Sequence, residues 1–347
     1  MPSAFKSLPV IDITGLYQDD IEARRRVAAQ IGAASRDSGF FYIKGHPISR
    51  ALREQLLKAT IDFFDRPLDQ KMAYYIGKST NHSGYVPQGE EVFYAQKPDR
   101  KEAFDISPDV PADDPEVVAG KTPFMGPVMW PDDDAFRHAA STYYGEVSAL
   151  ARVMFRAFAL ALDLPETFFD DKLNRPASQL RLIHYPFDAA APADQPGIGA
   201  HTDYECFTIL LPTAPGLEVM NGLGEWIDAP PIEDAFVINI GDMLEIFSNG
   251  TFTATSHRVR KVKEERYSFP YFASCDYHTV VAPLPQFVSG ERPAKFAPLV
   301  SGDHLLAQTA QTFTYMKKRI EEGTFKLPDS NYALSSFGQE AKHRKTG

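Results

Sequence analysis

The sequence has few of the features that stabilise small or secreted proteins. Its 347 residues include only two cysteines, Cys206 and Cys275, which form no CxxC pair, so we expect neither a disulfide framework nor structural zinc. No apolar run approaches the roughly 18 residues that a membrane span needs, and the start lacks the apolar core of a signal peptide. These absences predict a soluble, cytoplasmic protein that does not bind membranes.

An excess of positive charge is also missing. The chain has 36 Lys and Arg against 46 Asp and Glu, a formal net charge of −10, which argues against a nucleic-acid partner because phosphate binding relies on clustered cations. A chain of this length can bury roughly 75% of its unfolded surface, so it can form a large core unaided. We therefore expect a small-molecule site, in a monomer or a homodimer.

The first half of the chain shows mainly helical periodicity. Apolar residues recur at helical spacing in three segments, which are 21–38, 52–63 and 136–161. Acidic residues precede the first and third of these, as is typical of a helix N-terminus. Between the second and third segments, residues 71–131 are rich in Gly and Pro and predict loops and short strands. The stripe from Phe136 to Ala161 is expected to be core.

From residue 180 the period changes from helical to two. Short runs rich in β-branched and aromatic residues predict strands at 180–185, 206–211, 235–240, 243–247 and 266–272. The pair Asn249-Gly250 predicts a hairpin that joins 243–247 to a strand over 251–259. Consecutive strands without helices between them indicate an antiparallel sandwich or jelly roll. One helix is expected over 301–319, followed by a polar tail in the last twenty or so residues.

A candidate metal site begins at His201-Thr202-Asp203. Roughly one His-x-acid triplet is expected by chance in this composition, so the context decides. The triplet lies just ahead of a predicted strand, where residues i and i+2 point to the same face and can reach one ion. His257, beyond the predicted hairpin, offers a second imidazole. Two imidazoles and one carboxylate that leave other positions open are typical of non-haem Fe(II) oxygen chemistry.

A candidate carboxylate anchor follows nine residues after His257. Arg266 and Ser268 are again at i and i+2 of a predicted strand and present a guanidinium and a hydroxyl together. The planar fork of Arg suits a carboxylate because it donates two parallel hydrogen bonds. Tyr185, at the end of another strand, could donate a third.

With these motifs in place, the chain resembles the isopenicillin N synthase-like branch of the iron(II)/2-oxoglutarate-dependent oxygenases. The segments that carry the resemblance are LPVIDI, GFFYIKGHPI, GYVPQGEE, DRKEAFDI, GPVMWP, LRLIHYPF, GIGAHTDYECFTILL, GLEVM, VINIGDMLEIFSNGTFTATSHRV and RYSFPYF. The resemblance implies that His201, Asp203 and His257 bind Fe(II), and that Arg266 and Ser268, assisted by Tyr185, hold the distal carboxylate of 2-oxoglutarate.

The same resemblance implies a fold of mixed α and β structure. Its core would be a double-stranded β-helix, or jelly roll, flanked by N-terminal, long central and C-terminal helices. We expect an N-terminal dioxygenase region at 1–125, the central helix and linker at 126–175, the jelly-roll core at 176–280, and a C-terminal strand, helix and tail at 281–347.

The implied activity is O₂-dependent hydroxylation or desaturation of a small metabolite, with release of succinate and CO₂. The resemblance also places the GYVPQGEE region over the cavity mouth. Tyr85, Phe93 and Phe104 are therefore candidate substrate contacts, although we expect the main role of the segment to be that of a tight loop, with Gly84 and Gly89 supplying the turns. Phe247 is either core or part of the pocket wall.

Three alternatives remain open at this stage. A 2-oxoglutarate-independent Fe(II) oxidase similar to isopenicillin N synthase could use Arg266 and Ser268 for its own substrate's carboxylate. Ethylene formation from 2-oxoglutarate is a further variation. A jelly-roll binding protein without turnover is a third possibility, although it would have no need of three metal ligands and a carboxylate clamp.

Overall fold

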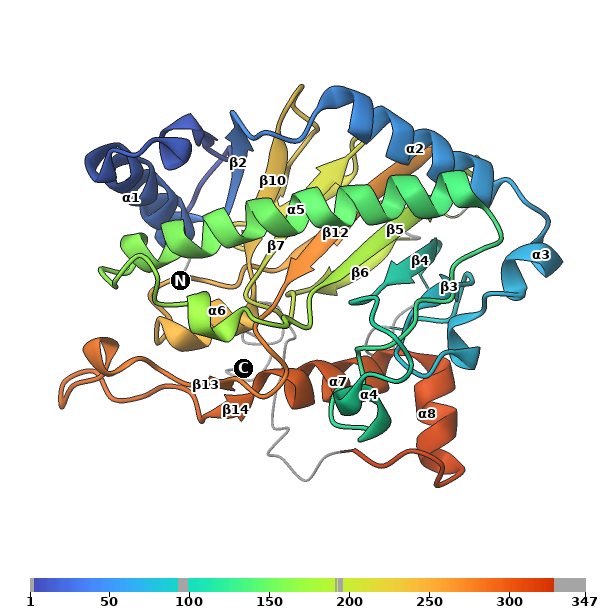
Figure 1. Cartoon of the computed structure of the whole chain (residues 1–347). Helices are drawn as coiled ribbons and strands as arrows, with labels where there is room; N and C mark the ends of the chain where they lie inside the picture. Colours follow the sequence, from blue (N-terminus) through green and yellow to red (C-terminus); the bar gives the residue numbers. More distant parts are fainter. Residues whose placement is uncertain (1–2, 93–98, 191, 193–195, 328–347) are drawn as a thin grey trace.

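The computed structural model describes residues 3–92, 99–190, 192 and 196–327. Figure 1 shows a large twisted sheet with the long helix α5 (Asp134–Ala161) across one face, and the C-terminal helices α7 (Ser301–Thr312) and α8 (Thr314–Glu321) below it. The other helices are α1 (Ile21–Asp37), α2 (Arg50–Phe64), α3 (Leu68–Met72), α4 (Pro115–Val118) and α6 (Asp242–Phe247). The predicted polar tail lies outside the described residues.

Two antiparallel sheets form the centre of the molecule. The eight-stranded sheet has the order β1-β2-β10-β7-β12-β5-β4-β3, with only β1 and β2 parallel, and the four-stranded sheet has the order β6-β11-β8-β9. The strands are β1 (Val10–Asp12), β2 (Phe40–Lys44), β3 (Gly84–Val86), β4 (Glu102–Ile106), β5 (Gln179–Tyr185), β6 (Ile198–His201), β7 (Phe207–Pro212), β8 (Leu217–Met220), β9 (Trp226–Asp228), β10 (Phe236–Ile240), β11 (His257–Val259), β12 (Arg266–Ala273), β13 (Val280–Val281) and β14 (Leu299–Val300). Residues of both sheets line one cavity, so the sheets face each other across it.

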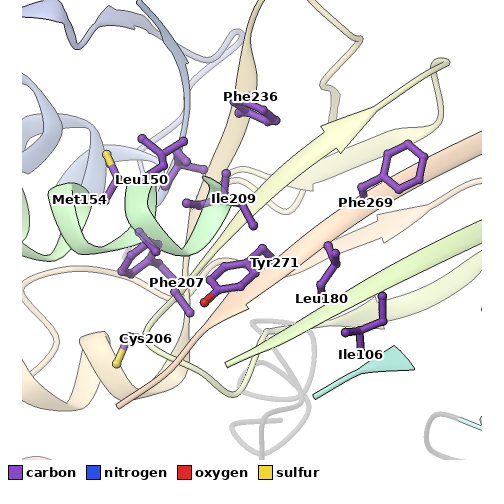
Figure 2. Close-up of a cluster of buried hydrophobic side chains, with 14 of the residues drawn as sticks. Ile106, Leu150, Met154, Leu180, Cys206, Phe207, Ile209, Phe236, Phe269 and Tyr271 are labelled. Carbon is purple, nitrogen blue, oxygen red and sulfur yellow. The ribbon is translucent and has the colours of Figure 1, made fainter. Parts of the chain in front are cut away.

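The three predicted N-terminal and central helices form as expected. The Asp20 side chain accepts a hydrogen bond from the amide of Glu22 and caps α1, and Asp133 caps α5 by accepting from the amide of Phe136. The apolar stripe of α5 is buried along most of its length against α1, α2 and β12. In Figure 2, Leu150 and Met154 of α5 lie in the cluster that contains Phe207. Burial of each such side chain contributes roughly 1.5–3 kcal/mol to the free energy of folding, so the packing of α5 stabilises the sheet.

The predicted strand at 243–247 is wrong, because these residues form α6. Every residue from Met243 to Phe247 is buried. The segment therefore lacks the alternation of buried and exposed positions that would distinguish a strand from a short helix. Asn249 and Gly250 do adopt positive φ, at 49° and 73°, but they end α6 instead of turning a hairpin. The Gly250 amide donates to the carbonyl of Glu245 at 2.8 Å, which closes the helix. Of the strand expected over 251–259, only β11 forms.

The single C-terminal helix expected over 301–319 is also wrong. Phe313 is extended, with φ −85° and ψ 131°, and separates α7 from α8. It forms an isolated antiparallel bridge with Glu91, and the amide of Val92 donates to the carbonyl of Thr312. The break thus ties the C-terminal helices to a loop that lies more than 200 positions earlier in the chain, a contact that helical periodicity does not reveal.

Candidate active site

Three predicted metal ligands meet where the smaller sheet opens into the cavity. His201 ends β6, His257 begins β11, and the two residues are direct partners in the antiparallel pairing. Their ring centroids lie 4.3 Å apart. Oδ1 of Asp203 lies 3.6 Å from Nε2 of His201 and 3.5 Å from Nε2 of His257. The three donor atoms are all within 4.8 Å of one another, which is close enough for one ion.

Hydrogen bonds orient all three side chains toward that common point. Nδ1 of His201 donates to the carbonyl of Gly199 at 2.8 Å, and Nδ1 of His257 donates to that of Thr255 at 3.2 Å. Both Nε2 atoms are therefore left with their lone pairs facing inward. The second oxygen of Asp203 accepts from Thr208, and from the Asn239 amide at 2.8 Å, so Oδ1 alone faces the imidazoles.

The protonation of these groups also suits a metal. Burial and the neighbouring His257 lower the pKa of His201 to about 4, so its imidazole is neutral at pH 7. Burial alone would raise the pKa of Asp203, but the two imidazoles and the Thr208 hydroxyl hold it well below its usual range. A neutral imidazole at His201 and an ionised carboxylate at Asp203 are the forms in which these side chains bind Fe(II).

A second, cationic part of the cavity surrounds Arg266, on β12. The Arg266 side chain is almost fully buried at 1% exposure, and among the described residues no acidic side chain acts on it. Its Nε donates to the carbonyl of Ala214 at 3.1 Å, one Nη donates to Ser268 Oγ at 3.3 Å, and its guanidinium lies 4.6 Å from the ring of Tyr185. A buried guanidinium without a counter-charge fits an anionic ligand such as a carboxylate.

The metal-ligand set and the Arg266 cluster open into the same cavity. Its volume is about 940 Å³, including the part that is open to solvent.

Of the predicted substrate contacts, Tyr85, Phe104 and Phe247 lie in the hydrophobic core and are not among the described residues that line the cavity. Tyr85 donates to Glu102 at 2.5 Å, and Phe104 packs against Phe63. Phe93 lies outside the described residues.

Several cavity residues escaped the sequence reasoning. Arg181 and Ile183 share the inward face of β5 with Tyr185, and Pro270 and Phe272 continue the face of Arg266 and Ser268 on β12. Extending the period-two pattern along these strands would have found them. No comparable signal exists for the members that loops and helix ends supply from distant parts of the chain: these include His82, Glu91, Lys101, Thr309, Thr312 and Phe313.

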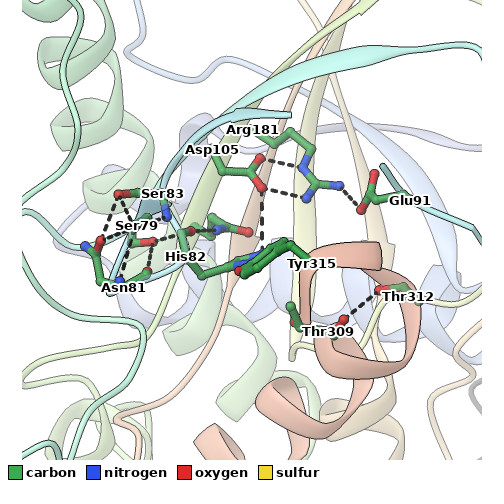
Figure 3. A network of polar contacts seen from close by, with 12 residues as sticks. Ser79, Asn81, His82, Ser83, Glu91, Asp105, Arg181, Thr309, Thr312 and Tyr315 are labelled. Carbon is green, nitrogen blue, oxygen red and sulfur yellow. Dashed lines mark hydrogen bonds and ion pairs between the residues drawn. The ribbon is translucent and has the colours of Figure 1, made fainter. Parts of the chain in front are cut away.

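Arg181 belongs to a buried network of charges, which Figure 3 shows from close by. It donates to both oxygens of Asp105, at 2.6 and 2.7 Å, and to Glu91 at 2.8 Å. Glu91 also pairs with Lys101, and these two cations hold the pKa of Glu91 at about 2 although burial opposes this. His82 forms a hydrogen bond of 2.5 Å with Tyr315 of α8. The network fastens the C-terminal helices to the cavity wall.

Comparison with protein families identifies the class that this fold and site define. Residues 8–133 match the non-haem dioxygenase in morphine synthesis N-terminal family, and residues 176–274 match the 2OG-Fe(II) oxygenase superfamily. The chain belongs to the 2OG-Fe(II) oxygenase superfamily. The expected resemblance and the double-stranded β-helix fold are confirmed.

Curated relatives align over nearly the whole chain. The 2-oxoglutarate-Fe(II) type oxidoreductase hxnY of Emericella nidulans is 33% identical over 90% of this chain and 94% of its own. The 2-oxoglutarate-dependent dioxygenase citB of Monascus ruber is 34% identical over 92% and 100%, and a homoarginine-6-hydroxylase of Oryza sativa is 34% identical over 90% and 99%. The protein is therefore a non-haem Fe(II)- and 2-oxoglutarate-dependent dioxygenase that acts on metabolites.

Solved structures agree with this assignment. A full-length Neurospora crassa protein in complex with alpha-KG, which is 2-oxoglutarate, has a TM-score of 0.76 and 27% identity over 87% of this chain and 96% of its own. A 2OG-Fe(II) oxygenase family protein from Caulobacter crescentus has a TM-score of 0.74 and 26% identity over 92% and 99%. Among the described helices, none combines the length and apolarity needed to cross a membrane.

Proposed function

We propose that this dioxygenase hydroxylates or desaturates a small metabolite, with His201, Asp203 and His257 as the Fe(II) ligands and Arg266, Ser268 and Tyr185 as the anchor for the distal carboxylate of 2-oxoglutarate. The observation that carries the proposal is that both groups open into one cavity. For hydroxylation, substrate RH, 2-oxoglutarate and O₂ give ROH, succinate and CO₂.

The chain's own residues have defined tasks in this reaction. Bound Fe(II) and 2-oxoglutarate supply the activation of O₂. The carbonyls of Gly199 and Thr255 keep both imidazoles in the tautomer that can bind metal, and Asn239 and Thr208 keep Asp203 ionised and aimed. Arg266 fixes the position of 2-oxoglutarate by binding its distal carboxylate, so that the opposite end of the molecule lies at the metal.

The apolar part of the cavity limits the access of water. Its walls include Phe40, Ile183, Leu210, Leu217 and Val259, from strands of both sheets. A dry wall around the metal favours attack on the bound substrate over side reactions with water. The substrate must therefore be small enough to enter a cavity of this size.

The names of relatives favour 2-oxoglutarate over the 2-oxoglutarate-independent alternative, since several contain this co-substrate. The non-catalytic binding protein is contradicted by the family assignment. Ethylene formation, the oligomeric state and the cytoplasmic location stay predictions. Homoarginine, in the name of one relative, and thymine, bound in a structure of the Neurospora crassa protein, illustrate the size of substrate that we propose.

The test measures succinate. Anaerobic protein is mixed with Fe(II) and 2-oxoglutarate, air is admitted, and succinate is quantified with and without iron. We expect Fe(II)-dependent succinate from the wild type and essentially none from His201→Ala or Asp203→Ala, because each loses a metal ligand. His278→Ala, at an exposed position away from the site, is the matched control. Equal succinate formation in all variants would refute the proposal.

A further inference from the structure

The strand that ends at His201 is irregular. β6 pairs with β11 at both of its ends, but between these pairs two residues of β6, Gly199 and Ala200, oppose the single residue Arg258. Such a β-bulge interrupts the ladder of hydrogen bonds, and bulges beside active sites re-aim a side chain. β6 is also the edge strand of its sheet, so within the described structure only β11 pairs with it. The direction of the His201 ring therefore depends on what fixes the bulge.

Two hydrogen bonds at Gly199 connect the bulge to the imidazole on one side and to a distant carboxylate on the other. The carbonyl of Gly199 accepts from Nδ1 of His201 at 2.8 Å, so Nε2 faces the metal-binding point only while this carbonyl stays in place. The amide of Gly199, which is buried, donates to Oδ1 of Asp99 at 3.2 Å, 100 positions earlier in the chain. Asp99 thus reaches the metal ligand through one backbone residue.

Asp99 is itself buried and held in place. Its Oδ2 lies 3.8 Å from Nζ of Lys101, which also pairs with Glu91. Among the described residues Oδ2 has no hydrogen-bond partner, and Asp99 is not one of those that line the active-site cavity. A carboxyl oxygen accepts a hydrogen bond whether the group is ionised or protonated, so the contact with Gly199 does not depend on the charge of Asp99. This arrangement suits a supporting role and not direct contact with substrate.

We propose that Asp99 is a positioning residue for the metal ligand His201 and acts through the backbone of Gly199. The inference rests on the proposed function, because it takes His201 to bind Fe(II). Without the acceptor at Asp99 the bulge relaxes, and the carbonyl that orients the imidazole moves with it. Groups that orient a ligating histidine typically contribute 10- to 100-fold to metal affinity. Asp99 acts one step further away, so the lower end of that range is expected.

Metal binding is measured apart from turnover, with Co(II) as a probe that takes the same nitrogen and oxygen ligands and is stable in air. Metal-free protein is titrated calorimetrically, and the visible absorption spectrum of the bound ion reports its coordination. We expect Asp99→Ala to raise the Kd for Co(II) about tenfold and to alter the spectrum. An Asp99→Ala protein with the wild-type Kd or the wild-type spectrum would overturn the inference. Asp99→Ser, with a similarly shortened side chain, serves in its place if the alanine variant does not fold.

Rescue by the conservative variant distinguishes positioning from a loss of stability. Asp99→Asn keeps an oxygen that accepts from the Gly199 amide, so its Kd should stay within about threefold of wild type, with the wild-type spectrum. A Kd as high as that of Asp99→Ala would contradict the role of this hydrogen bond.

Glu102→Ala is the matched control, since it removes another buried acid three residues along the same segment. Glu102 hydrogen-bonds Lys71, Tyr85 and His184, none of which is a proposed metal ligand. We expect this variant to lower the melting temperature at least as much as Asp99→Ala and yet to bind Co(II) with the wild-type Kd. Circular dichroism verifies the fold of each variant. An equal loss of Co(II) affinity in the control would refute the positioning role.

His201→Ala separates this inference from the proposed function. If the wild type binds Co(II) and His201→Ala binds it far more weakly, the metal site stands, and an unchanged Kd in Asp99→Ala makes only the assignment of Asp99 wrong. If the wild type binds no Co(II), or His201→Ala binds it equally well, the proposed function fails and the inference about Asp99 fails with it.

Discussion

Arg266 is buried where no acid of the described chain neutralises it, and the residues around it explain how it is tolerated. The carbonyl of Ala214 and the Ser268 hydroxyl accept from it, and the ring of Tyr185 lies against its face. These contacts stabilise the cation only in part, and burial lowers the pKa of Arg266 accordingly. Under the proposed function a carboxylate ligand would complete the set, so we expect this side chain to govern co-substrate affinity.

Arg266→Ala is expected to raise the apparent KM for 2-oxoglutarate roughly 10- to 100-fold, because a charged hydrogen-bonded contact contributes about 1.5–3 kcal/mol. Arg266→Lys should lie between wild type and alanine, since lysine retains the charge without the fork. The measurement is succinate formation as a function of 2-oxoglutarate concentration. Arg156→Ala, which removes an exposed arginine paired with Asp170, is the control. An unchanged KM in Arg266→Ala would contradict the anchor role.

At this scale the sequence predicted the centre of the site better than its walls. His201 and Asp203 are local neighbours, so strand geometry was sufficient to bring these two together. His257 was assigned through the family resemblance, because the hairpin expected ahead of it does not form. Glu91 and Phe313 reach the cavity because α7 stops beside a loop from the first third of the chain. Such apposition depends on the packing of the whole molecule, and no local pattern encodes it.

At the scale of elements, α1 and β2 are joined by one tight turn at Gly39. Its φ is +68°, which side chains rarely adopt, and an added Cβ would lie 2.2 Å from the carbonyl oxygen of Thr253. The turn thus brings the start of β2 against the segment that leads into β11. Glycine is required here for both conformation and space.

Gly39→Ala is expected to lower the free energy of unfolding by at least about 3 kcal/mol, because strain and collision add. Gly120→Ala provides the matched comparison: its φ is +62°, but open space surrounds it, so only about 1 kcal/mol is expected. Urea denaturation of both variants measures the difference. Equal destabilisation would show that the contact with Thr253 is relieved at no cost.

The elements also show where periodicity is a sufficient guide. The stripe of α5 runs over seven turns and one face, so it could be predicted from the sequence. In α6 only six residues are involved and nearly all are buried, and a short buried run has the same composition in a helix and in a strand. Asn249-Gly250 predicted its positive φ values correctly, but the same backbone geometry serves a hairpin and a helix end.

At the scale of the molecule, buried histidines link stability to pH. His304 of α7 is 1% exposed, and neither of its ring nitrogens has a hydrogen-bond partner among the described residues. Burial lowers its pKa to about 4, whereas in the unfolded chain it protonates near 6.5. Between these values the unfolded state binds more protons, so stability is fully present above pH 6.5 and declines as the pH falls toward 4.

His304→Leu should remove up to about 3 kcal/mol of this pH dependence. The measurement is the free energy of unfolding at several pH values between 4 and 7, and the variant is expected to show the shallower slope. His138→Leu, on the exposed side of α5, should keep the wild-type slope. Parallel profiles for all three proteins would contradict the assignment.

The larger sheet has a consequence for dissecting the protein. Strands β1 to β4 come from the first 106 residues, yet β2 pairs with β10 and β4 pairs with β5. A fragment reduced to residues 176–274 would lose these partners. The edges of β10 and β5 would then expose unpaired backbone amides and carbonyls, which can hydrogen-bond to another chain. Expressed alone, such a fragment should precipitate or form fibrils. Transplanting the oxygenase core into a new scaffold therefore requires the amino-terminal strands to travel with it.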